Sequence, residues 1–484
     1  MTSDHNQTPI VVWLRQDLRL ADNPALTFAS ASGRPVIVLY LFDTDPDQRP
    51  MGGASLWWLN RSLKALSASL QAIGSRLILR KGKASDVLPQ VLAETGAGQV
   101  VWNRLYEPSA IARDTRLKAA LKATGVEVQS FNAALLNEPW TVETGSGGPY
   151  KVFTPYWRAA RAKVTELPAL PAPQNLVSPE RWPDSDCLAD WQLQPTHPDW
   201  STGFDDWNPG EAGALDNLND FLGGPANHYA DGRDQPGKSG TSRLSPHLHF
   251  GEISPRQVWI AAHGASAMGD LNEGARDKFL AEIGWREFNH HLLFHFQTLP
   301  TANFKPGFDR FAWQEDAEGL KAWQRGLTGY PMVDAGMREL WATGWMHNRV
   351  RMITASFLIK HLLIHWREGE AWFWDTLLDA DLANNAAGWQ WTAGTGADAS
   401  PYFRIFNPFS QGEKFDPKGD YIRRWVPELA RLPNKVIHRP WEATAFELST
   451  AGVTLGQTYP HPIVDHAKAR ARALSAYAAL KDDA

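Results

Sequence analysis

The sequence of 484 residues contains one cysteine, Cys187. A single thiol excludes a disulfide framework, a cysteine-based zinc site and an iron–sulfur cluster held by four thiolates. No apolar run approaches the about 18 residues that cross a membrane, and the polar start Met1–Pro9 lacks the apolar core of a signal peptide. We therefore expect a cytoplasmic protein without a membrane segment.

An excess of basic residues is also missing, because the formal net charge is −5. Overall charge thus gives no sign of a nucleic-acid binder, and any contact with DNA needs a local basic patch. Tryptophan is abundant instead, with 23 residues. These rings fit either a core rich in aromatics or side chains that stack on bases or carry electrons, and composition does not separate the two.

Short apolar runs alternate with helical stretches over the first 140 residues. Five of them predict buried strands: Ile10–Leu14, Val36–Leu41, Arg76–Leu79, Gln99–Trp102 and Val126–Ser130. The intervening segments, such as 54–73 and 110–124, are amphipathic. This alternation indicates an α/β domain with a doubly wound parallel sheet, which binds ligands at the carboxyl ends of its strands. No GxGxxG motif follows the first strand, so a dinucleotide site of that kind is not supported.

The pattern changes after the α/β part of the chain. Prolines, tryptophans and polar residues dominate from about 168 to 209, and apolar residues return at helical spacing in 277–296, 337–365 and 467–480. We predict an α/β domain over residues 1–140, a linker over 141–209 and a large all-α domain over 210–484.

Two segments of the predicted helical domain combine small hydroxyls or charges with aromatic rings. Gly240–Ser245 precedes a helix, so its hydroxyls and N–H groups suit a phosphate or serve as an ordinary cap, and the Tyr229 phenol is close in sequence. Further along, four side chains share one helical face, which is either functional or merely solvated: Glu282, Trp285, Arg286 and Asn289.

Two later segments are equally dense in functional groups. The residues Trp345, Asn348, Arg349 and Met352 cluster on one side of a predicted helix, which is compatible with a site or with core packing. The segment Asp379–Trp391 holds two acids, two amides and two tryptophans with little periodicity, which predicts a functional loop. We expect no metal there, because histidines at ligand spacing are absent.

The motifs in order resemble the photolyase and cryptochrome family over nearly the whole chain. They are the N-terminal Trp13–Asn23 and the segments Asp334–Arg338, Gly344–Arg349, Gly388–Trp391 and Pro401–Pro408. The resemblance implies an N-terminal antenna domain, a long linker and a helical domain that binds a U-shaped FAD.

The same resemblance assigns residues to the cofactor. It places Tyr229, Thr241, Ser242, Arg243, Leu244 and Ser245 at the FAD phosphates. Arg286 reaches toward the same cofactor, and Asp379 and Asp381 accept from the flavin ring and the folded ribityl–adenine part. Arg351 pairs with Asp379, and counting from Asp381 and from Trp389 places Asn385 rather than Asn384 opposite flavin N5.

The implied function is light-dependent repair of cyclobutane pyrimidine dimers in DNA by electron transfer from excited FADH⁻, a carbon–carbon lyase reaction without net redox change. The dimer leaves the duplex and meets a wedge of Trp285 and Trp391, with Glu282 and Asn348 bonding the bases and Met352 packing on them. The resemblance assigns contacts with the flanking phosphates to Arg233, Arg349 and Gln411. It also assigns an electron-transfer chain from the flavin to the surface to Trp389, Trp366 and Trp313.

The resemblance also implies an antenna pigment in the N-terminal domain. We expect methenyltetrahydrofolate, with a deazaflavin as the alternative. Glu107 is suited to accept hydrogen bonds from a pterin edge, unless it is a plain surface carboxylate. We expect the protein to act as a monomer on damaged DNA.

Three other functions remain open. Plant cryptochromes, which are photoreceptors, carry Asp where Asn385 stands, and signalling members often have long tails, whereas this chain ends soon after the 467–480 helix. Enzymes that repair (6-4) photoproducts place histidines at the positions of Asn348 and Met352. A flavoprotein without turnover is the non-enzymatic alternative. Within the photolyases we favour the plant-cryptochrome-like bacterial lineage.

Overall fold

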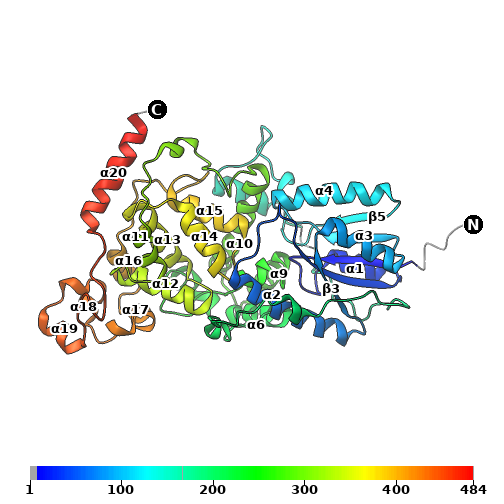
Figure 1. Cartoon of the computed structure of the whole chain (residues 1–484), viewed down its shortest axis with the longest axis horizontal. Helices are drawn as coiled ribbons and strands as arrows, with labels where there is room; N and C mark the ends of the chain where they lie inside the picture. Colours follow the sequence, from blue (N-terminus) through cyan, green and yellow to red (C-terminus); the bar gives the residue numbers. More distant parts are fainter. Residues whose placement is uncertain (1–7, 166, 483–484) are drawn as a thin grey trace, which may run out of the picture.

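The computed structural model describes residues 8–165 and 167–482. Residues 1–7, which carry most of the polar start, lie outside the described residues. Figure 1 shows an α/β domain at one end of the long axis and a larger helical domain at the other, with the C-terminal helix α20 (His466–Asp482) projecting from the helical end. The predicted fold class is confirmed. None of the described helices is long and apolar enough to cross a membrane.

The α/β domain is built on a five-stranded parallel sheet in the order β3-β2-β1-β4-β5. Its strands are β1 (Ile10–Leu14), β2 (Val36–Asp43), β3 (Leu77–Gly82), β4 (Gln99–Asn103) and β5 (Glu127–Phe131). All five predicted strands form. The expectation that 126–130 is buried is wrong, because β5 is an edge strand that pairs on one side only and alternates half-buried with exposed residues.

Alternating side chains of the sheet supply two cores. Val12 and Val38 face α1 (Pro24–Ala31) and α2 (Gly53–Ala72). Val11 and Ile37 face the opposite side, against α3 (Ala84–Thr95) and α4 (Pro108–Ala123). Consecutive residues of a strand point to opposite faces of the sheet, so a continuous apolar run supplies side chains to the cores on both faces.

The helical domain follows, and one of its helices lies in the segment expected to be a linker. Its elements are α5 (Phe153–Arg161), α6 (Glu211–Leu222), α7 (Tyr229–Gly232), α8 (Ser245–His249), α9 (Pro255–Ala267), α10 (Glu273–His295), α11 (Ala317–Gln324), α12 (Pro331–Thr343), α13 (Asn348–Ser356), α14 (Trp366–Thr376), α15 (Leu382–Ala393), α16 (Pro408–Phe415), α17 (Asp420–Trp425), α18 (Asn434–Ile437) and α19 (Ala445–Ala451). Helix α5 packs on α10, where a Cβ at Gly284 would lie 2.6 Å from the Trp157 ring.

The apolar run 337–365 is not the single helix that its spacing predicts. Helix α12 ends at Thr343, because Gly344 adopts a left-handed φ of 67°. A Cβ there would lie 2.6 Å from Leu378, so the turn needs glycine. Helix α13 begins after the His347 cap and continues as a π-helix over Phe357–His361. Trp345 therefore precedes α13 instead of sharing its face.

Buried polar contacts join the two domains. The Trp58 indole of α2 donates to Glu252 (3.0 Å), which also pairs with His247 of α8 (2.5 Å). The N–H groups of Leu20 and Ala21 donate to Glu211, which opens α6 (2.8 and 2.9 Å).

Gly251 tests how tightly the domains are docked. Its φ is +66°, and a Cβ would lie 2.1 Å from the Gln16 carbonyl oxygen of the other domain. Because Gly251→Ala adds both backbone strain and a clash, we expect it to lower the free energy of unfolding by about 3 kcal/mol or more. Gly269→Ala, at φ +85° in open space, should cost only about 1 kcal/mol. Equal losses in denaturant unfolding would contradict this docking.

Candidate functional site

The segment Gly240–Leu244, which precedes α8, carries polar groups that are free to bind a ligand. The hydroxyls of Thr241 and Ser242 make no hydrogen bond to the described residues. Arg243 has a left-handed φ of 52°, a strained conformation for this residue type, and its guanidinium lies over the Trp207 ring at 3.9 Å. Ser245 opens α8, and its Oγ lies 3.4 Å from the indole nitrogen of Trp345.

The neighbours of this segment are apolar. Leu244 and Tyr229 are buried in the same cluster, where Tyr229 packs edge-on against Phe221 and Phe279. Burial raises the pKa of the Tyr229 phenol well above its usual range, and the Glu282 charge adds to the effect. Tyr229 therefore offers a neutral hydroxyl from the same cluster that holds Leu244 of this segment.

The acid and amide segment is a helix, so the predicted loop over 379–391 is wrong. Asp381 begins α15 as its cap, accepting from the Asn384 backbone N–H at 2.7 Å. The Asp381 cap and the small residues that follow it stabilise this helix. The mixed composition of the segment hides the helical periodicity in the sequence. Burial alone would raise the pKa of Asp381, but His290 (3.3 Å) and His249 hold it well below its usual range.

Asp379 and Arg351 form a bidentate ion pair, with distances of 3.1 and 2.8 Å. The Arg351 Nε also donates to the Met346 carbonyl at 2.7 Å, which fixes the plane of the guanidinium. The Asp379 side chain is 3% exposed and that of Arg351 24%. The sequence prediction of this pair agrees with the structure.

The two amides of α15 have different partners. Asn384 is fully engaged, because its amide accepts from Asn289 of α10 (2.8 Å) and donates to Asp381 (2.8 Å). Asn385 donates from Nδ2 to the Glu370 carboxylate (2.8 Å) and carbonyl (3.0 Å), while its own oxygen has no partner among the described residues. Asn385 is thus the amide with an acceptor left for a ligand.

The predicted substrate residues lie on α10, α13, α15 and α16, apart from Arg233, which directly follows α7. Glu282 pairs with Arg233, and the Trp285 ring stacks on Phe153 of α5 (3.8 Å, 7°). Arg286 donates instead to the Ala134 carbonyl at 2.7 Å. The side chains of this face of α10 therefore point to different partners.

On α13, Arg349 pairs with Asp234 at 2.8 Å and lies over Phe415, with Met352 sulfur 3.8 Å away. Asn348 is exposed, and Trp391 and Gln411 are half-buried.

The three tryptophans of the expected electron chain surround the start of α14. Trp389 packs against this helix, since a Cβ at Gly369 would lie 2.0 Å from its ring. Trp366 is fully buried and donates to Asn303 (2.8 Å). His365 lies between Trp366 (5.6 Å) and Trp313 (4.9 Å).

Two features of the tryptophan electron-transfer chain differ from what the sequence predicts. Trp313 is half-buried instead of exposed. The sequence also did not reveal Trp323, which contacts Trp389 at 6.0 Å and is fully buried.

Glu107 is the cap residue of α4 and is half-buried, so it is less exposed than a plain surface carboxylate would be. Burial raises its pKa, and the nearby Asp381 charge raises it further, whereas His249 and His290 oppose the shift. The carboxyl group is therefore near enough to the charged groups of the helical domain for its pKa to depend on them.

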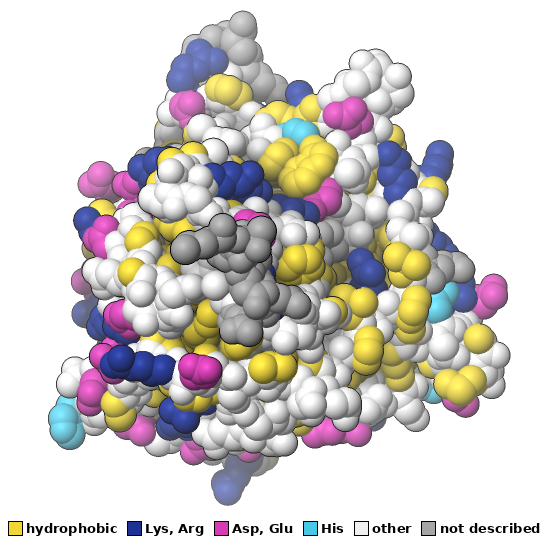
Figure 2. All heavy atoms as spheres, turned by 90° about the vertical axis from the view of Figure 1, so that its right-hand side faces the viewer, with side chains coloured by type: hydrophobic (Ala, Val, Ile, Leu, Met, Phe, Trp, Pro, Cys, Tyr) yellow, Lys and Arg dark blue, Asp and Glu magenta, His cyan; other side chains and the backbone are white. Residues whose placement is uncertain are grey.

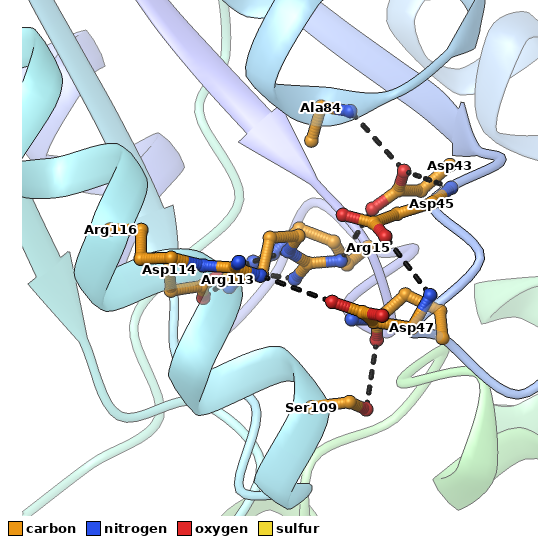
Figure 3. A network of polar contacts seen from close by, with 10 residues as sticks. Arg15, Asp43, Asp45, Asp47, Ala84, Ser109, Arg113, Asp114 and Arg116 are labelled. Carbon is orange, nitrogen blue, oxygen red and sulfur yellow. Dashed lines mark hydrogen bonds and ion pairs between the residues drawn. The ribbon is translucent and has the colours of Figure 1, made fainter.

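Charged side chains fill the adjoining carboxyl end of the sheet (Figure 3). Arg15, just after β1, pairs with Asp114 at 2.9 Å, and Arg113 pairs with Asp43 at 2.8 Å and with Asp114 at 2.8 Å. This edge, where doubly wound sheets bind ligands, is thus occupied by the protein's own ion pairs. Figure 2 views the molecule from the α/β end and shows basic, acidic and apolar side chains interspersed on that face.

Comparison with known proteins identifies the family. Residues 279–479 match the FAD binding domain of DNA photolyase, and residues 10–174 match DNA photolyase. The chain is 56% identical to a deoxyribodipyrimidine photo-lyase of Agrobacterium fabrum over 98% of both chains. It is 42% identical to Cryptochrome-1 of Arabidopsis thaliana, over 95% of this chain and 69% of the relative.

A solved structure agrees with this result. The crystal structure of a bacterial class III photolyase from Agrobacterium tumefaciens has a TM-score of 0.96 and 54% identity, covering 100% of this chain and 99% of that one. The chain belongs to the DNA photolyase family and carries its FAD-binding domain, as the sequence predicts. The unpaired hydroxyls of Thr241 and Ser242 and the free acceptor of Asn385 fit such a cofactor.

The ion pair of Asp379 and Arg351 leads to a prediction about FAD. Removing one partner of a buried pair costs about 3 kcal/mol or more, so Asp379→Ala should weaken FAD binding about a hundredfold. The measurement is the flavin-to-protein absorbance ratio after purification. Glu428→Ala, which breaks the more exposed Arg338–Glu428 pair (2.8 Å), is the matched control and should keep its FAD. Full FAD content in Asp379→Ala would contradict the assignment.

Trp366 leads to a prediction about photoreduction. Because Trp366 starts α14 against His365, one helical turn before Gly369, which packs on the Trp389 ring, Trp366→Phe should strongly slow photoreduction of bound FAD by an external reductant. Repair by chemically reduced protein should persist. The rate of bleaching of the flavin absorbance under blue light measures the effect. A normal rate in Trp366→Phe would show another route, and Trp323→Phe would then be the variant that slows it.

Proposed function

We propose that the protein is a deoxyribodipyrimidine photo-lyase that repairs cyclobutane pyrimidine dimers in DNA. Fully reduced FAD, held by residues such as Thr241, Arg351 and Asp379, would supply the light-driven electron transfer for ring opening without net redox change. The relatives named photo-lyase support this activity, and the observation that carries it is Asn385, a neutral amide held by Glu370. A neutral amide near N5 affects the flavin without acting as an acid, whereas the Asp of plant cryptochromes can donate a proton to N5.

The proposed cofactor roles are those that the family resemblance assigns, and the contacts are compatible with them. Thr241, Ser242 and the neighbouring residues would hold the phosphates, and Arg351 with Asp379 would pair beside the flavin ring. Asp381 is committed to its cap and to His290, so we infer that it stabilises α15 and contributes to FAD through that helix. Arg286, bonded to Ala134, stays a predicted neighbour of the cofactor.

The substrate roles remain predictions as well. Glu282, oriented by Arg233, bonds the 5′ base, and Asn348 bonds a base edge. Trp285, supported by Phe153, forms the apolar wedge with Trp391. The phosphates meet Arg233, Arg349 and Gln411, a local patch that lets a net-acidic monomer bind DNA.

The antenna is proposed to be methenyltetrahydrofolate near Glu107. Its carboxyl group makes no hydrogen bond to the described residues, so it can accept from a pterin edge. The carboxyl end of the sheet already holds the Arg15–Asp114 and Arg113–Asp43 pairs (Figure 3), which disfavours a deazaflavin placed there, because breaking buried pairs is costly. We also propose the domain limits 1–140 for the α/β domain, 141–209 for the linker and 210–484 for the helical domain.

The test is repair of defined lesions. Reduced protein is illuminated with oligonucleotides that hold either a cyclobutane dimer or a (6-4) photoproduct, and restored bases are counted by chromatography. We expect repair of the cyclobutane dimer alone, only in the light. Glu282→Ala should reduce the yield, and Glu273→Ala, at the exposed start of the same helix, should not. Repair of the (6-4) product alone, or no repair, would contradict the proposal.

A further inference from the structure

An arginine of the α/β domain reaches into the helical domain beside Asn385. Arg49 lies between β2 and α2, and its guanidinium forms a bidentate pair with Glu370 of α14, at 2.7 and 2.9 Å. The same guanidinium lies over the Trp374 ring at 4.1 Å. The Glu370 side chain is 5% exposed, so its charge depends on this partner.

Glu370 in turn determines which end of the Asn385 amide faces it. The oxygen Oε1 of Glu370 accepts from Arg49 Nη1 (2.7 Å) and from Asn385 Nδ2 (2.8 Å). A second bond runs from the same Nδ2 to the Glu370 carbonyl at 3.0 Å. An ionised carboxylate and a carbonyl only accept hydrogen bonds, so only the NH₂ end of the amide can face them. The amide oxygen is therefore directed away and stays without a partner among the described residues.

We propose that Arg49, through Glu370, is a positioning residue that fixes the amide of Asn385 with its oxygen toward the flavin, a role that rests on the proposed function. A reduced flavin carries a proton on N5 and donates there, whereas an oxidised flavin accepts there. An amide oxygen can only accept, so this orientation favours the reduced form. The α/β domain thereby contributes to the redox equilibrium of a cofactor bound in the other domain.

The proposal is tested by the midpoint potential of bound FAD in dye-coupled titrations. In Glu370→Gln an amide of the same shape can donate to Asn385, which lets the amide turn. In Arg49→Gln the carboxylate loses its cation and its fixed position. Both variants should shift the equilibrium about tenfold toward oxidised flavin, the size of one hydrogen bond, which is about 30 mV for a two-electron couple.

A matched control separates this role from domain docking. Asp375 also joins the two domains, accepting from the Gly53 N–H at 2.8 Å, but does not contact Asn385. Asp375→Ala should therefore keep the wild-type potential. If Arg49 acts through Glu370, the double variant Arg49→Gln/Glu370→Gln should shift the potential no further than Glu370→Gln alone.

The outcomes are distinct. FAD content and thermal unfolding confirm that each variant is loaded and folded. If Arg49→Gln does not fold, Arg49→Lys replaces it: this variant keeps the charge but loses the bidentate geometry, so the potential should shift in the same direction by a smaller amount. Loaded variants with the wild-type potential would overturn the positioning role and leave the proposed function standing. Wild-type protein that binds no FAD would overturn both.

Discussion

Buried carboxylates at the domain boundary impose the constraint on which the site depends. A carboxylate removed from water must be paired completely, or it destabilises the fold by several kcal/mol. Glu252 meets this need between Trp58 of α2 and His247 of α8, and Glu370 meets it between Arg49 and Asn385. Both sets of bonds form only when the domains dock in one arrangement.

This docking places the parts of the flavin site relative to each other. Helix α8 carries His247 and follows directly on the hydroxyls of Thr241 and Ser242. Helix α14 carries Glu370 and packs against α15, which presents Asn385 and Trp389. The α/β domain is therefore a structural part of the proposed cofactor site, in addition to its proposed role as an antenna domain. The polar interface is specific because its buried carboxylates have all of their donors in this one arrangement.

Local patterns predicted what local physics decides. The short apolar runs located the five strands to within a few residues. The central strands β1, β2 and β4 are mainly continuous hydrophobic sequence because buried parallel strands need it, whereas β5 is a half-exposed edge strand. The break at Gly344 was missed, because its left-handed turn depends on Leu378 and Phe204 in space. Helix α15 was read as a loop, because a capping acid and two amides obscure the periodicity. Glu370 was missed entirely, since its partner Arg49 is 321 positions away.

The most direct test of a photo-lyase is whether light-driven repair leaves the flavin unchanged. Fully reduced protein, freed of excess reductant and kept without oxygen, is illuminated with an excess of cyclobutane dimers while the flavin absorbance is recorded. The expected result is that restored pyrimidine pairs exceed bound FAD many times over and the reduced spectrum persists. Oxidation of one flavin for each dimer opened, with repair stopping at a single turnover, would contradict the account.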